Sequence, residues 1–148
     1  MEEQIFIVKN PSTNYIKQVA KKIDGIVGYK NITPAAFIKR TIKKILQGNA
    51  MFLMSFSDET KETVTGFVML SEFEDYDGKV LVIENAWLEK TNRTGNEFWD
   101  AIKNIAKTLG YKKVIAETKR SVAAINKKYG FTERSRIIEY NITEAHNG

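Results

Sequence analysis

A glycine-containing segment beside a predicted helix is the part of this sequence best suited to bind a charged ligand. It precedes apolar residues at helical spacing (residues 98–109) and consists of Asn92, Arg93, Thr94, Gly95, Asn96 and Glu97. The unpaired N–H groups at a helix N-terminus, together with the helix dipole, attract anions. Gly95 lets the backbone approach a phosphate closely, and Arg93 adds a positive charge. The sequence therefore predicts an anion-binding loop at this position.

Composition excludes several other kinds of chemistry. The chain has 148 residues and no cysteine, so disulfides, thiolate zinc sites and a cysteine nucleophile are ruled out. Its only histidine, His146, lies in a polar tail. A histidine-based metal site and a Ser-His-Asp triad are therefore implausible, and we expect no bound metal.

The formal net charge is +5, with lysine pairs at positions 21–22, 43–44, 112–113 and 127–128. Such pairs are typical of solvated helix faces, although the charge also suits an anionic partner such as nucleic acid or a phosphorylated cofactor. The longest apolar runs are far shorter than a bilayer requires, and the acidic start of the chain is unlike a signal peptide. We therefore expect no membrane association and a cytoplasmic location.

Periodicity predicts that the chain opens with one strand and two helices. Residues 5–8 form a short apolar run, and a helix capped by Ser12 follows and extends to about Ile23. Thr33 and Pro34 indicate the start of a second helix, because threonine caps the first turn and proline suits the first helical position.

Strands and helices continue to the end of the chain: strands at 51–56, 64–73, 80–88, 114–117 and 132–142, and helices at 98–109 and 121–129. Gly66 indicates a bulge. The strand at 80–88 is apolar on both faces, as is typical of a covered central strand, and the helical crossover places 114–117 parallel to it. The fold class is therefore α/β (α+β). Residues 1–148 are predicted to form a single domain with a mixed, mostly antiparallel sheet, one parallel β-α-β pair and helices on both faces.

This order of elements, with a glycine loop between the fourth strand and the third helix, resembles the GNAT superfamily of acyl-CoA-dependent N-acetyltransferases. The resemblance implies six to seven strands and about four helices in this chain, and the family carries an Arg/Gln-x-x-Gly-x-Gly/Ala loop where this chain has residues 92–97. Lys128-Tyr129-Gly130-Phe131 looks like the Gly-Phe ending of the family's fourth helix. The resemblance implies acetyl-CoA as co-substrate, bound through Trp87, Leu88, Asn92, Arg93, Thr94, Gly95 and Asn96.

The resemblance also implies direct attack of an amine on the thioester, which needs a base, an oxyanion donor and an acid. Glu84, on the central strand, is the candidate base, and its alternative role is a solvent-facing carboxylate. The backbone N–H of Trp87 or Leu88, beside an expected bulge, is the candidate donor. The tyrosine that protonates the leaving thiolate in the family aligns with Asn126, which cannot act as an acid. Tyr129, three residues on, is the other catalytic candidate, and its alternative role is packing.

The predicted function is therefore transfer of an acetyl group to an amine on a small molecule or a protein. A GNAT-like binding or structural module without activity, as in some phage accessory or virion proteins, is the alternative. Glu97, Asn126 and the bulky Trp87 motivate it, because the Glu97 carboxylate would repel a pyrophosphate unless it points away. Nucleic-acid contact is a third hypothesis, which rests on charge alone. The sequence leaves open the acceptor and the oligomeric state, including a homodimer.

Overall fold

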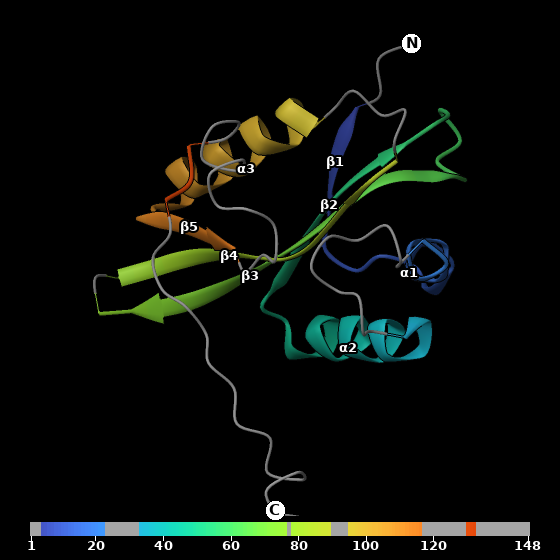
Figure 1. Cartoon of the computed structure of the whole chain (residues 1–148), viewed down its shortest axis with the longest axis horizontal. Coiled ribbons are helices and arrows are strands. Elements are labelled where there is room, and N and C mark those ends of the chain that lie inside the picture. Colours follow the sequence, from blue (N-terminus) through green and yellow to red (C-terminus); the bar gives the residue numbers. More distant parts are fainter. Residues whose placement is uncertain (1–3, 23–32, 77, 90–94, 117–129, 133–148) are drawn as a thin grey trace, which may run out of the picture.

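The computed structural model describes residues 4–22, 33–76, 78–89, 95–116 and 130–132. These residues form β1 (Ile5–Val8), α1 (Thr13–Ala20), α2 (Pro34–Gln47), β2 (Ala50–Phe56), β3 (Val64–Asp75), β4 (Gly78–Leu88), α3 (Gly95–Leu109) and β5 (Lys113–Ala116). The strands join one sheet in the order β1-β2-β3-β4-β5. Figure 1 shows α1 and α2 on one face of this sheet and α3 on the other.

The strand directions confirm the predicted mixed sheet. The pairs β1–β2, β2–β3 and β3–β4 are antiparallel, whereas β4 and β5, joined through α3, are parallel. As predicted, β4 is an interior strand, with β3 on one side and β5 on the other, and helices cover both faces of the sheet. The expected helix at 121–129 and nearly all of the expected strand at 132–142 lie outside the described residues. No helix in the described ranges is long and apolar enough to cross a membrane.

Local capping explains where α1 and α2 begin. The Ser12 hydroxyl accepts a hydrogen bond from the Tyr15 N–H at 3.3 Å, and the Thr33 hydroxyl accepts one from the Ala36 N–H at 3.1 Å. The predicted end of α1 was wrong, because the helix stops at Ala20. Just beyond it, the Lys22 N–H bonds to the Val19 carbonyl in a tighter turn that ends the α-helical pattern.

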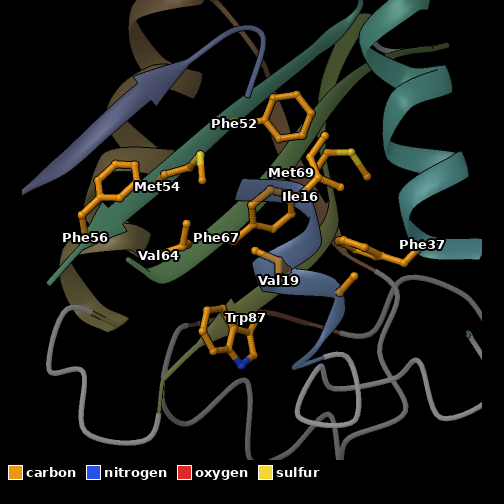
Figure 2. Close-up of a cluster of buried hydrophobic side chains, with 11 residues drawn as sticks. Ile16, Val19, Phe37, Phe52, Met54, Phe56, Val64, Phe67, Met69 and Trp87 are labelled. Carbon is orange, nitrogen blue, oxygen red and sulfur yellow. The ribbon is translucent and has the colours of Figure 1, made fainter. Parts of the chain in front are cut away.

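Each face of the sheet carries its own apolar core. The α1/α2 core, shown in Figure 2, consists of Ile16, Val19, Ala20, Phe37, Phe52, Met54, Phe56, Val64, Phe67, Met69 and Trp87. The α3 core consists of Leu53, Val68, Leu70, Leu81, Phe98, Ile102 and Ala106. Successive residues of β2 and β3 alternate between the two cores, because side chains point to opposite faces along a strand. The middle of the sheet is therefore covered on both sides, as was predicted for the strand at 80–88.

Two irregularities interrupt the sheet where the site is built. Between β2 and β3, the partners Ser55↔Gly66 and Phe56↔Val64 leave Thr65 as an extra residue. The bulge predicted at Gly66 is thus present one residue earlier. Between β3 and β4, the partners Met69↔Asn85 and Leu70↔Ile83 leave Glu84 as the extra residue. A bulge of this kind bends the strand and re-aims the side chains beside it.

Candidate active site

The bulge at Glu84 coincides with the point where β4 stops pairing with β5. The parallel pairs run from Val80↔Lys113 to Ile83↔Ala116, and Glu84 follows directly. Beyond it, the end of β4 continues to pair with β3, while no described strand pairs with its other edge. The bulge was expected beside Trp87 and Leu88, and this position was wrong, because the register of β3 against β4 places it three residues earlier.

After the bulge, successive backbone N–H groups of β4 point alternately toward β3 and toward the opposite edge of the strand. The Glu89 N–H donates to the Thr65 carbonyl on β3 at 2.9 Å. Because N–H directions alternate along a strand, the Trp87 N–H also faces β3. Those of Ala86 and Leu88 face the opposite edge. Of the two donors that the sequence proposed, only Leu88 therefore faces this edge, and Ala86 is the edge-facing residue closer to the bulge.

The side chain of Glu84 lies on the α1/α2 face, where three groups contact its carboxylate. The Arg40 guanidinium is 2.8 Å away and the Lys44 ammonium 3.5 Å away, both from α2, and the Ser71 hydroxyl donates at 2.6 Å from β3. The carboxylate is only partly exposed, with 14% of the side chain accessible. These contacts join α2 to the centre of the sheet.

The N-terminus of α3 lies at the same end of β4. Gly66, which pairs with Leu88, lies directly against the buried ring of Phe98 in the first turn of α3. Gly95 is the first residue of α3, and Asn96 and Glu97 are exposed. Glu97 makes no hydrogen bond or ion pair with any other described residue. Asn92, Arg93 and Thr94 lie outside the described residues.

The aromatic residues near the site have separate roles. Trp87 is buried at the margin of the α1/α2 core, on the face opposite α3 (Figure 2). Trp99, on α3, packs against Phe131 with ring centroids 4.8 Å apart, and an open pocket of about 490 Å³ adjoins them and β5.

Gly130, which precedes Phe131, has a left-handed φ of 79°. The catalytic candidates Asn126 and Tyr129 lie outside the described residues.

Sequence reasoning missed several polar residues at this site. Arg40, Lys44 and Ser71 contact Glu84 from distant parts of the chain, and no local pattern marks such contacts. Asn85 was also missed, although a polar residue within the apolar run of β4 was a usable signal. Its side chain is 2% exposed. In the described part of the chain, no cluster of three or more His, Asp or Glu side chains could hold a metal ion.

Comparisons with known proteins give structural matches only, since no protein-family model and no curated protein sequence matches the chain. An aminoglycoside N-acetyltransferase in complex with CoA superposes with a TM-score of 0.69 at 13% identity, over 95% of this chain and 96% of that one. A predicted acetyltransferase with acetyl-CoA from Clostridium acetobutylicum superposes at 0.67 and 18% identity, covering 97% and 99%. An aminoglycoside 6'-N-acetyltransferase from Acinetobacter baumannii superposes at 0.68 and 11% identity, covering 94% and 97%. The chain therefore has the fold of the GNAT acetyltransferases.

Proposed function

We propose that this chain is an acyl-CoA-dependent N-acetyltransferase, acting as one domain over residues 1–148, that transfers an acetyl group from acetyl-CoA to an amine. The observation that carries the proposal is the bulge at Glu84, directly after the last β4–β5 pair at Ile83↔Ala116. It leaves backbone N–H groups of a central strand facing an edge without a described partner strand. Solved structures of the same fold hold CoA or acetyl-CoA.

The start of α3 fits the phosphate end of the co-substrate. The first-turn N–H groups at Gly95 and Asn96 carry the positive end of the helix dipole. Glu97 is exposed and does not occupy them. We assign Asn92, Arg93 and Thr94, which precede the helix, to the same phosphate site, where Arg93 supplies a charge. The edge-facing N–H of Leu88 lies between this site and the bulge and suits an amide carbonyl of the pantetheine arm.

Acetyl-CoA supplies an acyl carbon activated by its thioester. The amine nitrogen bonds to this carbon as the carbon–sulfur bond breaks; the electron pair leaves on sulfur, which takes a proton, and the amine loses one. Glu84, on the α1/α2 face, is the proposed acceptor of the amine's proton, directly or through water. The Ala86 N–H, beside the bulge, is the proposed donor to the carbonyl oxygen, because the Trp87 N–H faces β3.

Two further assignments concern the acid and the acceptor. Of the two catalytic candidates on the predicted fourth helix, Tyr129 can protonate the leaving thiolate and Asn126 cannot, because an amide does not ionise. Two of the structural neighbours are aminoglycoside acetyltransferases, which supports an amine-bearing small molecule as acceptor.

An activity assay tests this function. The full chain is incubated with acetyl-CoA and a panel of amines, including aminoglycosides and amino sugars, and the released thiol is followed together with the mass of the acetylated product. Thiol release that depends on one class of amine supports the proposal. If acetyl-CoA binds but no amine is acetylated, the acceptor assignment is wrong. If acetyl-CoA does not bind at millimolar concentration, the protein is a non-catalytic module with this fold.

A further inference from the structure

The carboxamide of Asn85 is a buried donor without an acceptor. The residue is 2% exposed, and its Nδ2 atom has no hydrogen-bond partner in the described part of the chain. Burial of a polar group without a partner is costly, and nearly all buried polar side chains in native proteins have one. Such a group near the end of β4, where no described strand pairs with the outer edge, therefore suggests that its acceptor arrives with a ligand.

Asn85 occupies the reacting end of the proposed site. It is the first β4 residue after the bulge at Glu84, and its cross-strand partner is Met69. Met69 and Trp87 both belong to the α1/α2 core, so Asn85 lies on that face. The face is opposite α3, where the phosphate end of the co-substrate is proposed to bind. The next residue along the strand is Ala86, whose backbone N–H faces the edge of β4.

The neighbours of Asn85 on this face do not provide an acceptor. Met69, opposite it, and Trp87, two residues on, are apolar except for the indole N–H, which only donates. The adjacent carboxylate of Glu84 is engaged with Arg40, Lys44 and Ser71. In apolar surroundings a neutral acceptor is far less costly to bury than a charged one. An uncharged carbonyl oxygen is therefore the ligand group that fits.

We propose that the Nδ2 atom of Asn85 donates a hydrogen bond to the carbonyl oxygen of the acyl group of bound acyl-CoA. This assignment rests on the proposed function. The Ala86 N–H approaches that oxygen in the plane of the sheet, and Asn85 approaches it from the α1/α2 side. Two fixed donors then meet the atom on which negative charge develops during transfer. The cost of an unpaired amide in the free protein is recovered when the acyl group binds.

The experiment compares two ligands that differ in the carbonyl. Calorimetric titrations with acetyl-CoA and with CoA, which lacks the acyl group, are made on the wild type, Asn85→Leu and Asn85→Ala. Leucine keeps most of the volume without the donor, and alanine covers the case in which leucine does not fit. The matched control is Asn104→Leu, the same change at an exposed position on α3. The readout is the ratio of the two dissociation constants.

Loss of one hydrogen bond lowers the affinity of Asn85→Leu for acetyl-CoA by about two- to tenfold and leaves its affinity for CoA unchanged. The free variant melts at the same or a higher temperature than the wild type, because an unpaired buried amide has been removed. Asn104→Leu changes neither affinity. Equal effects on both ligands, or no effect on either, overturn the inference. A wild type that binds neither ligand refutes the proposed function itself.

Discussion

Gly66 lies so close to Phe98 that a Cβ atom on Gly66 would stand 2.8 Å from two carbons of the phenylalanine ring. The same Cβ would stand 2.5 Å from the Ser55 hydroxyl oxygen. Such distances are shorter than any real Cβ contact, so only glycine permits this approach. Because Gly66 pairs with Leu88 and Phe98 belongs to the first turn of α3, the contact fixes the start of the helix beside the end of β4.

Gly66→Ala is therefore expected to destabilise the protein. Overpacking of this kind costs about 1–3 kcal/mol of the free energy of unfolding, and three contacts under 3.0 Å place this variant at the upper end. Gly48→Ala is the control: it has open space around it but a left-handed φ of 74°, so it costs about 1 kcal/mol. Urea denaturation measures both. A Gly66→Ala variant as stable as the wild type would show that the sheet and α3 separate freely.

Two hydrogen bonds of the Gln18 side chain join α1 to the end of the β2–β3 turn. The side chain of Gln18 donates to the Glu62 carbonyl at 2.7 Å and accepts from the Val64 N–H at 2.9 Å. Gln18→Ala leaves both backbone groups without this partner and should lower the free energy of unfolding by about 1–3 kcal/mol. Gln47→Ala, at the exposed end of α2, should change it by less than about 0.5 kcal/mol. Equal stability of the two variants would show that the two Gln18 hydrogen bonds do not stabilise the fold.

Glu84→Gln separates catalysis from stability. If Glu84 accepts the proton of the amine, kcat falls by about 10²-fold or more. The half-exposed partner Arg40 limits the stability lost with the ion pair to about 1 kcal/mol. The control is Glu72→Gln, whose exposed carboxylate lies 3.3 Å from Lys79 on the opposite face of the sheet from Ser71 and Glu84. Steady-state rates and thermal melting are measured together. Full activity in Glu84→Gln would leave the carboxylate only its role of joining α2 to the sheet.

Alkaline pH should destabilise the protein through Tyr111. Burial raises the pKa of the Tyr111 phenol above its usual value of 10.0, the Glu72 carboxylate raises that pKa further, and Lys79 opposes them. The folded state thus holds this proton more tightly than the unfolded state. Its contribution to stability is complete below about pH 10 and is lost as the pH rises through the folded pKa.

Melting temperatures at about pH 9 and about pH 11 test this contribution. Tyr111→Phe should lose less stability over this interval than the wild type, because it has no phenol to ionise. Tyr76→Phe, at a fully exposed position on the β3–β4 hairpin, serves as the control and should follow the wild type. Identical losses in Tyr111→Phe and the wild type would show that another group causes the alkaline transition.

The parts of the fold that depend on neighbouring residues could be read from the sequence. Ser12 and Thr33 cap the helices that they were predicted to cap, and the apolar run of β4 marked a central strand. The bulge was misplaced because β-strand register depends on the partner strand. The sequence of residues 80–88 does not by itself indicate that Leu70 pairs with Ile83 while Met69 pairs with Asn85.

Only part of the candidate site could be predicted, because the contacts of its side chains also depend on distant parts of the chain. Glu84 stood out as a carboxylate in an apolar strand, but its contact with Arg40 spans 44 residues of sequence and depends on how α2 lies on the sheet. Asn85 differs again, because its significance comes from a missing acceptor, which only the packed structure reveals. Residue type identified where polar groups interrupt β4, and the three-dimensional contacts determined what each can do.

The proposed function depends most on acetyl-CoA binding at the start of α3, and calorimetric titration of the full chain measures this directly. We predict saturable binding of one acetyl-CoA per chain. Arg93→Ala should weaken it about tenfold or more through loss of a charged phosphate contact, and Lys107→Ala, a matched loss of charge in the last turn of α3, should leave it unchanged. Absence of binding at millimolar acetyl-CoA, or equal effects of the two variants, would contradict a phosphate site at the start of α3.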